Sequence, residues 1–333
     1  MSNADVRIVV LDGHTVNPGD NPWDALAELG DVMVYERTPP ALVRERAGGA
    51  QIVLTNKTVL NATLLADLPQ LRFISVLATG YNVVDVAAAG KLGIPVANVP
   101  AYSSRTVAQH TIALMLELAN QVGLHDAAVK AGEWSSSMDF CFWKQPLTEL
   151  DGLTLGIVGF GSIGRSVARI AQALGMTVIV HTPHPPALED GGVIRFVSLE
   201  ELCAAADVVS LHCPQTAGNT GFVDRSLLSR MKPTAWLINT ARGALVNEQD
   251  LADALSCGAL AAAALDVVAT EPVAADNPLL AAPNCIITPH VAWAALAARQ
   301  RLMRQSVANV AAFLAGKPVN VVNTGYLGAP AAG

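Results

Sequence analysis

The feature that most constrains this chain is a glycine-rich stretch that follows a short apolar run. The run spans residues 155–158, and Gly159, Gly161 and Gly164 follow it with G-x-G-x-x-G spacing. Apolar residues then recur at helical spacing, so the glycines lie where a strand turns into a helix. A backbone without Cβ atoms can approach a pyrophosphate there, and the amides and positive dipole end of the helix face its charge.

The residues after this loop complete a recognisable unit. Residues 176–180 are predicted to form a second buried strand, which closes a strand-helix-strand unit of about thirty residues. A lone G-x-G-x-x-G is a weak signal that a structural turn would also explain, and the second strand is what favours dinucleotide binding. In this setting Gly164 allows the helix to pack closely on the strand.

Composition limits the class of protein and its partners. A length of 333 residues fits two ordinary domains, and a hydrophobic fraction of 52% is ample for their cores. A net charge of −7 lacks the basic excess of a phosphate-backbone binder, so we expect no nucleic-acid partner. Since no apolar run approaches the roughly twenty residues that span a bilayer, we expect a soluble protein with no membrane partner. The five cysteines show no paired spacing typical of zinc, which predicts reduced thiols, no metal and a cytoplasmic location.

Apolar runs alternate with helical patterns along the chain, which predicts parallel sheets with helices on both faces. A long apolar helix over residues 106–119 and an irregular, aromatic region over 133–146 separate two series of strands. The first series is predicted at residues 6–11, 32–35, 52–55, 72–77 and 94–98, with helices at 21–29, 40–47 and 84–92. The second series follows the glycine loop at residues 208–211, 235–239, 262–267 and 285–288.

The final helix, predicted over residues 295–314, is long enough to return the chain to its first part. We therefore expect an α/β protein with two doubly wound parallel-sheet domains. One domain is predicted to be discontinuous, with residues 1–101 and 294–333, and the nucleotide-binding domain is predicted to span residues 102–293.

Three strands of the second series end in polar clusters. Arg242, Glu271 and His290 lie in these clusters, and open parallel sheets place their ligands at such strand ends. The set suits hydride transfer between a 2-hydroxy acid and its keto form. The guanidinium of Arg242 offers a planar fork that can hold a carboxylate and polarise the neighbouring carbonyl.

The histidine of this set would move the proton. An imidazole ordinarily exchanges protons near neutral pH, so His290 can protonate the carbonyl oxygen as hydride arrives, or take the proton back in the reverse reaction. Glu271 would hold the imidazole in orientation, and its negative charge would favour the protonated form.

Several motifs in a fixed order now carry a resemblance that covers nearly the whole chain. The sequence resembles the D-isomer-specific 2-hydroxyacid dehydrogenases, and within them the branch of glycerate dehydrogenases and hydroxypyruvate reductases. The motifs are LATGYNVVD at residues 77–85, TVAQH at 106–110, GFGSIG at 159–164, LHCP at 211–214, NTARG at 239–243, LDV at 265–267, EP at 271–272 and TPH at 288–290.

The resemblance implies a flavodoxin-like substrate domain and a Rossmann coenzyme domain, with the active-site cleft between them and dimerisation through the coenzyme domain. It implies reduction of hydroxypyruvate or glyoxylate with NAD(H) or NADP(H), and a homodimer. The implied catalytic residues are Arg242, Glu271 and His290, and the implied substrate-binding residues are Ala78, Thr79, Gly80 and Arg242.

The resemblance also implies which residues hold the coenzyme. Asp266 would bind the nicotinamide carboxamide. The other implied cofactor-binding residues are Thr106, Gly159, Gly161, Ser162, Ile163, Gly164, Thr182, Pro214, Thr220, Thr240, Ala241 and His290.

One departure from the family leaves the coenzyme open. NAD-specific members carry an acidic residue about twenty residues past the glycine loop to bind the adenosine ribose. This chain has HTPHPP at residues 181–186 instead. Without a carboxylate near Thr182 nothing repels a 2′-phosphate, but no arginine stands there to bind one, and His184 would do so only weakly.

Other interpretations stay open at this point. The chain also fits oxidation of formate, phosphite or 3-phosphoglycerate by the same family, or a non-catalytic NAD-sensing co-repressor. The aromatic residues of segment 140–143 fit a core or interface role, or a segment that reaches a partner's active site. The expected structural histidines are His14, His110, His125, His181 and His212.

Overall fold

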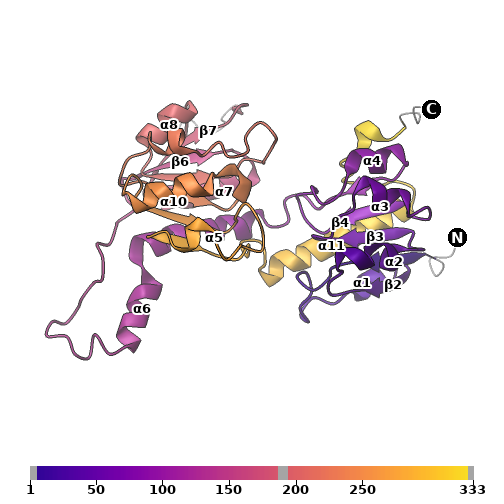
Figure 1. The fold of residues 1–333 in the computed structure, drawn as a ribbon, viewed down its shortest axis with the longest axis horizontal. Helices are drawn as coiled ribbons and strands as arrows, with labels where there is room; N and C mark the ends of the chain where they lie inside the picture. Colours follow the sequence, from indigo (N-terminus) through magenta and orange to yellow (C-terminus); the bar gives the residue numbers. More distant parts are fainter. Residues whose placement is uncertain (1–5, 187–193, 329–333) are drawn as a thin grey trace. The chain divides into compact units, whose positions relative to one another are not determined.

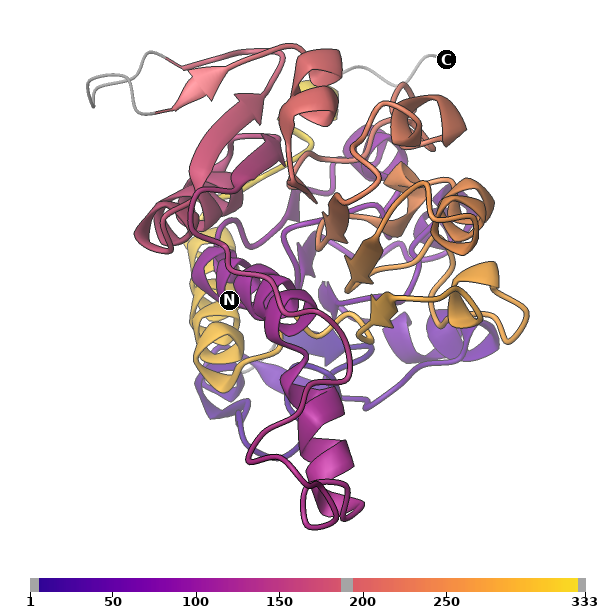
Figure 2. The same ribbon diagram turned by 90° about the vertical axis from the view of Figure 1, so that its left-hand side faces the viewer.

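The computed structural model describes residues 6–186 and 194–328 and divides the chain into two compact units. Unit 1 holds the chain up to Ser103 and again from Ala294, and unit 2 holds Ser104–Trp293 (Figures 1 and 2). Each unit has one sheet, and every strand pair in both sheets is parallel. The predicted α/β class with two doubly wound sheets is therefore confirmed.

Unit 1 is built on a five-stranded sheet with the order β2-β1-β3-β4-β5. The central strands β3 and β4 are buried along their whole length, which explains why they appear in the sequence as continuous apolar runs. The strands are β1 (Arg7–Val10), β2 (Asp31–Val34), β3 (Ile52–Thr55), β4 (Phe73–Val76) and β5 (Val96–Ala97). The helices are α1 (Asp24–Ala27), α2 (Val43–Ala47), α3 (Ala62–Ala66), α4 (Val86–Lys91) and α11 (Leu296–Leu314), with short 3-10 turns η2 (Pro40–Leu42) and η5 (Thr324–Tyr326).

The start of α1 differs from the prediction. The helix predicted to begin at residue 21 begins at Asp24 in the structure. The Asn21 side chain is buried, and its Nδ2 donates to the carbonyls of Val16 (3.1 Å) and Arg299 (3.2 Å). The asparagine thus ties the loop after β1 to α11, a contact between residues that are distant in the sequence.

Unit 2 is built on a seven-stranded sheet with the order β12-β11-β10-β9-β6-β7-β8. The chain begins this sheet at β6 and adds β7 and β8 on one side of it, then returns to add β9 to β12 on the other side. The strand order therefore reverses between β6 and β9, which is where ligands bind in open α/β sheets. The strands are β6 (Thr154–Val158), β7 (Thr177–His181), β8 (Arg195–Phe196), β9 (Val208–Leu211), β10 (Trp236–Asn239), β11 (Ala262–Leu265) and β12 (Cys285–Ile287). The helices are α5 (Ser104–Asn120), α6 (Val122–Lys130), α7 (Ser162–Ala173), α8 (Leu199–Ala205), α9 (Arg225–Leu228) and α10 (Glu248–Ser256), with 3-10 turns η3 (Gly243–Leu245) and η4 (Pro278–Leu280).

Two helices on one side of this sheet matter for the site. Helix α5 packs against α7 and also reaches β10 and β11, and its apolar face joins theirs in one buried cluster. Helix α6 follows α5 after Gln121, which adopts a left-handed backbone (φ 50°), and extends away from the sheet of unit 2 (Figures 1 and 2). None of the helices in residues 6–186 and 194–328 has the length and apolar character needed to cross a bilayer.

Candidate active site

The three glycines of the loop after β6 differ in what surrounds them. Gly159 has φ +97°, and a Cβ there would lie 2.6 Å from the amide nitrogen of Cys213. A Cβ on Gly164 would lie 2.3 Å from the carbonyl oxygen of Gly159. A Cβ on Gly161 would meet no protein atom within 4 Å. The outer two glycines therefore serve packing, while the middle one borders open space where a pyrophosphate can approach.

The first turn of α7 supplies donors to that space. Gly161 is the N-cap residue and offers no side chain to cap the helix. Across the part of the chain that the structure describes, the amides of Ser162, Ile163 and Gly164 have no protein acceptor. Ser162 Oγ lies 2.8 Å from Ser104 Oγ at the start of α5. Free amides at the positive end of a helix, beside a glycine that leaves room, fit the phosphates of a dinucleotide.

Neighbouring strand ends bring other predicted residues to this loop. The Gly159 amide donates to the His181 carbonyl (2.8 Å), which places Thr182, the next residue, beside the glycine loop. The His212 amide donates to the Val158 carbonyl (2.7 Å). Pro214, two residues after His212, therefore also lies near the start of the glycine loop. Burial lowers the pKa of His212 to about 4, so this histidine adds no positive charge at neutral pH.

Thr220 and Thr106 are two further predicted cofactor-binding residues of unit 2. Thr220 is exposed in the turn after Pro214, and its hydroxyl donates to the Thr216 carbonyl (3.1 Å). Thr106 is half-buried in the first turn of α5. Their contact with a coenzyme stays a prediction.

The three predicted catalytic residues follow three adjacent strands. Arg242 follows β10, Glu271 follows β11 and His290 follows β12, and these strands are neighbours in the sheet. Asn239 pairs with Leu265 and Leu265 with Ile287, so the three strands end in register at one edge. The topology thus places all three side chains at the carboxyl edge of the sheet.

His290 and Glu271 form a close pair at this edge. Nδ1 of His290 lies 2.6 Å from Oε2 of Glu271, and the side chains are 27% and 33% exposed. An ionised carboxylate can only accept, so Nδ1 carries the proton of this bond. The other ring nitrogen, Nε2, is then free to exchange a proton with a bound molecule. The predicted pairing of Glu271 with His290 is present in the structure.

The loop that carries Arg242 is fixed by a residue that the sequence reading missed. Asn239, at the end of β10, is fully buried; its Oδ1 accepts from the Ala241 amide (3.0 Å) and its Nδ2 donates to the Arg242 carbonyl (2.9 Å). Gly243 lies so close to Val268 that a Cβ would come within 1.9 Å of the Val268 carbonyl carbon. The guanidinium of Arg242 itself is exposed, which leaves it available to an anion.

Asp266 is almost completely buried. The residue is 1% exposed, and its carboxylate accepts from Thr288 Oγ1 (2.6 Å) and from the amides of Val291 and Ala292 (2.9 Å each). Burial alone would raise its pKa, but hydrogen bonds from His110, Thr288 and these amides outweigh burial and lower the pKa. The carboxylate is therefore charged and holds the turn that carries His290. Its contact with nicotinamide stays a prediction.

In unit 1, the predicted substrate-binding residues follow β4. The Val99 amide donates to the Ala78 carbonyl (3.0 Å), and Asn98 Nδ2 donates to the Thr79 carbonyl (2.7 Å), so this turn is anchored through its carbonyls. Within residues 6–186 and 194–328, the amides of Ala78, Thr79 and Gly80 donate to no protein acceptor. Such unpaired, consecutive amides are suited to an anion.

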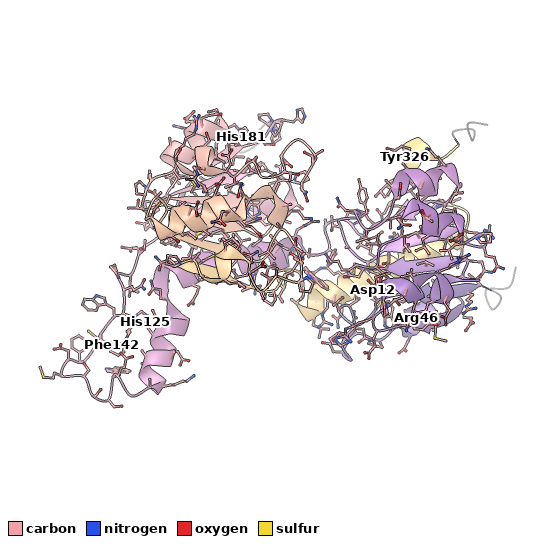
Figure 3. The ribbon with its side chains drawn as sticks, in the orientation of Figure 1. Asp12, Arg46, His125, Phe142, His181 and Tyr326 are labelled. Carbon is pink, nitrogen blue, oxygen red and sulfur yellow. The ribbon has the colours of Figure 1, made fainter. Side chains whose placement is uncertain are left out.

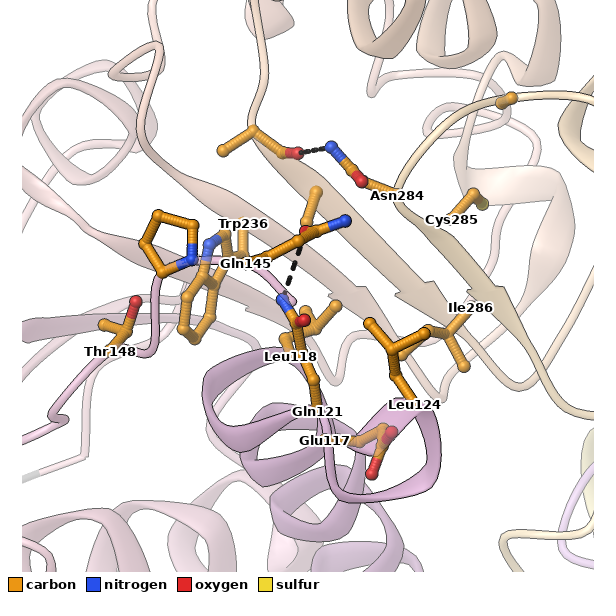
Figure 4. A pocket seen from close by; sticks show the side chains of 14 residues that line it. Glu117, Leu118, Gln121, Leu124, Gln145, Thr148, Trp236, Asn284, Cys285 and Ile286 are labelled. Carbon is orange, nitrogen blue, oxygen red and sulfur yellow. Dashed lines mark hydrogen bonds between the residues drawn. The ribbon is translucent and has the colours of Figure 1, made fainter. Parts of the chain in front are cut away.

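A separate cavity of about 440 Å³ lies at the opposite edge of the unit 2 sheet (Figure 4). It is bordered by the first residues of β10, β11 and β12 and by the end of α5. Gln121 Nε2 donates to Gln145 Oε1 (3.2 Å) in its wall, and a dashed line joins these two side chains in Figure 4. Arg242, Glu271 and His290 follow the other ends of the same strands, so this cavity is distinct from the site described above.

Fold and site together define a class: an NAD(P)-dependent oxidoreductase, with a dinucleotide loop and an acid/base pair on one Rossmann sheet. The family model described as the D-isomer specific 2-hydroxyacid dehydrogenase, NAD binding domain, matches residues 112–292. The chain belongs to the D-isomer-specific 2-hydroxyacid dehydrogenases, which confirms the resemblance noted in the sequence.

Individual relatives agree with this assignment. A hydroxypyruvate reductase of Blautia hydrogenotrophica is 50% identical over 322 residues, covering 96% of this chain and 100% of the relative. A glycerate dehydrogenase of Methylorubrum extorquens is 44% identical, covering 86% of this chain and 90% of the relative. The crystal structure of an NADPH-dependent glyoxylate/hydroxypyruvate reductase from Sinorhizobium meliloti, in complex with NADP and malonate, is similar with a TM-score of 0.83 at 30% identity, covering 96% of this chain and 97% of that one.

Proposed function

We propose that this chain reduces hydroxypyruvate, and also glyoxylate, with a reduced nicotinamide coenzyme, and that it interconverts hydroxypyruvate and D-glycerate. The observation that carries the proposal is the 2.6 Å contact between His290 and Glu271, with Arg242 on the adjoining strand end. The names of the two relatives above support the same substrates.

The residues fit the coenzyme. The free amides of Ser162, Ile163 and Gly164 and the open space at Gly161 suit its pyrophosphate. Thr182 follows β7 beside the glycine loop, which supports its proposed contact with the adenosine ribose. When bound, the reduced nicotinamide supplies the hydride.

The side chains of the protein bind the 2-keto acid and transfer the proton. The guanidinium of Arg242 binds the substrate carboxylate and polarises the carbonyl. The amides of Ala78, Thr79 and Gly80 are suited to bind a carboxylate as well. His290 Nε2 donates a proton to the carbonyl oxygen, which becomes the hydroxyl. Glu271 stabilises the protonated imidazole through the bond to Nδ1 and keeps the ring in orientation. In the oxidative direction Nε2 takes the proton back.

A substrate panel tests this proposal. Steady-state rates are measured from the absorbance of the reduced coenzyme with hydroxypyruvate, glyoxylate, pyruvate and 3-phosphohydroxypyruvate, each with NADH and with NADPH. We expect the highest kcat/KM with hydroxypyruvate. The proposal fails if no 2-keto acid is turned over, or if formate, phosphite or 3-phosphoglycerate oxidation is faster.

Coenzyme preference should respond to residue 182. A Thr182→Asp variant places a carboxylate beside the adenosine ribose, which repels a 2′-phosphate and accepts from the 2′-hydroxyl. We expect the ratio of kcat/KM for NADH over NADPH to rise on the order of 10- to 100-fold, or about 1.4–2.7 kcal/mol. Thr177→Asp, an exposed position at the other end of β7, is the matched control and should leave the ratio unchanged. An unchanged ratio in Thr182→Asp would refute the assignment of residue 182.

We infer that two copies pair through unit 2. The arm segment, defined as residues 122–148, includes α6 and extends away from the sheet (Figure 3). Met138, Phe140 and Trp143 are 100%, 89% and 65% exposed, while only Phe142 packs locally, with its ring centroid 6.4 Å from that of His125. A cluster of large apolar side chains in water is typical of a surface that a partner covers.

Removing two of these side chains should weaken pairing. We expect the wild-type chain to show the mass of a dimer by light scattering, and a Phe140→Ser/Trp143→Ser variant to shift toward the monomer with an unchanged circular dichroism spectrum. Leu280→Ser, which removes a large apolar side chain that is 51% exposed in unit 2 outside the arm segment, should remain dimeric. A monomeric wild-type chain would contradict the inference. A fall in kcat in the double variant would support the hypothesis that the segment borders a partner's active site.

A further inference from the structure

Two consecutive residues of α5 contact the two catalytic loops of unit 2. Nε2 of His110 lies 3.0 Å from Thr288 Oγ1 and 3.4 Å from Asp266 Oδ1. Oγ1 of Thr111 lies 2.9 Å from Thr240 Oγ1. Thr288 stands two residues before His290, and Thr240 stands two residues before Arg242. One turn of α5 therefore contacts both the loop that carries His290 and the loop that carries Arg242.

The hydrogen-bond network fixes which nitrogen of His110 carries a proton. The carboxylate of Asp266 is charged and can only accept, so Thr288 Oγ1 donates its hydrogen to Asp266. Thr288 Oγ1 is then left to accept from His110. Nε2 of His110 must carry the hydrogen, and it points at both Thr288 and Asp266. His110 is hydrogen-bonded, as expected of a structural histidine, and its partners belong to the loops that carry His290.

That turn needs external support. His290 adopts a left-handed backbone (φ 53°), a conformation that is strained for a residue with a side chain. Its amide donates to the carbonyls of Asp266 (2.8 Å) and Thr288 (2.9 Å). The next two amides, of Val291 and Ala292, donate to the Asp266 carboxylate. The conformation that aims the imidazole thus depends on Asp266 and Thr288, both of which His110 contacts.

Thr111 supports the other loop in the same way. It is fully buried, and its hydroxyl donates to the Val107 carbonyl (2.9 Å) of the preceding turn. Its oxygen is therefore the acceptor of the bond from Thr240, which is 8% exposed. Together with the two bonds from Asn239, this contact holds the backbone that leads into Arg242.

We propose that His110 and Thr111 are positioning residues that together set the spacing between the His290 imidazole and the Arg242 guanidinium. The proposal rests on the proposed function, because it assumes that these two groups act on one substrate. Helix α5 suits the task, since it packs on α7, β10 and β11 and its position is therefore fixed by the core of unit 2. A misplacement of reacting groups by about 1 Å can cost on the order of 100-fold in rate.

The test compares deletion with conservative replacement. His110→Leu and Thr111→Val should each lower kcat for hydroxypyruvate on the order of 10- to 100-fold, with little change in the KM for the coenzyme. His110→Gln and Thr111→Ser keep a donor and a hydroxyl, and should recover most of the lost rate. Thr177→Val removes an exposed hydroxyl from β7 and should turn over as wild type. A purely structural role predicts a lower Tm and no recovery by the conservative variants.

A double-mutant cycle tests the route from His110 to His290. If His110 acts through Thr288, His110→Leu/Thr288→Val should be no slower than the slower single variant, so the effects are not additive. Fully additive losses, or wild-type kcat in His110→Leu, would overturn the proposal.

A second measurement does not depend on turnover. Hydrogen exchange of the amides of His290, Val291 and Ala292 should be faster in His110→Leu than in wild type, because their acceptors are no longer held. Unchanged exchange at these amides overturns the positioning role. A wild-type chain that is inactive on every keto acid, with faster exchange in His110→Leu, would instead reject the proposed function alone.

Discussion

Replacing His290 by alanine is expected to lower kcat for hydroxypyruvate by roughly 10²- to 10⁴-fold, the usual contribution of a positioned acid or base. Without the imidazole no protein group can donate a proton from the place that Nε2 occupies, so the alkoxide that forms as hydride arrives is not neutralised. The measurement is steady-state turnover at saturating coenzyme. The Tm should stay close to wild type, because the His290 side chain is partly exposed.

Two companion variants separate the proton step from other effects. Glu271→Gln keeps the shape of the orienting group but removes its charge, so we expect a smaller fall in kcat than in His290→Ala. His14→Ala removes a half-exposed imidazole of unit 1 and should have no effect on kcat. Turnover of His290→Ala near the wild-type rate would contradict the assigned mechanism.

The location of Arg242, Glu271 and His290 at one edge of the sheet could be predicted, because it follows from local sequence and a simple topological rule. Strands β10, β11 and β12 are short apolar runs, parallel and adjacent in the sheet, so polar residues after each one meet at a common edge. No side-chain packing had to be known to place Arg242, Glu271 and His290 there. Buried parallel strands are also the elements that stand out most clearly as continuous apolar runs.

The supports of these residues could not be predicted, because they depend on contacts between segments that are distant in sequence. His110 lies 178 residues before Thr288, and nothing in the α5 sequence indicates that they touch. Asn21 shows the same limit, since an asparagine before a proline suits a helix cap, yet its side chain binds α11. The short helices α3 and α9, of five and four residues, carry too few apolar positions to show a helical period.

Asp266 illustrates how the structure adds to a motif. The LDV motif predicts that Asp266 contacts the coenzyme. The structure shows that three donors of the turn from Thr288 to Ala292 hydrogen-bond to its carboxylate. A buried charge with this many hydrogen bonds is costly to disturb. The Asp266 carboxylate therefore holds the turn that carries His290, and its contact with nicotinamide stays a prediction.

Alanine substitutions at two glycines of the loop are expected to affect different properties, stability at Gly159 and coenzyme binding at Gly161. Gly159→Ala combines a left-handed backbone (φ +97°) with a Cβ 2.6 Å from the Cys213 nitrogen, so we expect a loss of roughly 2–5 kcal/mol in the free energy of unfolding. Gly152→Ala is the matched control, because φ is +77° there but nothing lies within 4 Å of the added methyl, and only about 1–2 kcal/mol should be lost. Thermal and denaturant unfolding measure both.

Gly161→Ala should weaken coenzyme binding and leave stability unchanged. Its methyl group meets no protein atom within 4 Å and enters the space assigned to the pyrophosphate. We expect wild-type stability and a Kd for the reduced coenzyme raised on the order of 10- to 100-fold, or about 1.4–2.7 kcal/mol. Titration by nicotinamide fluorescence gives the Kd, and hydroxypyruvate turnover at very high coenzyme concentration should recover much of kcat. Unaltered coenzyme affinity in Gly161→Ala would show that the nucleotide does not approach the backbone at this glycine, and the assignment of the phosphate site would have to be abandoned.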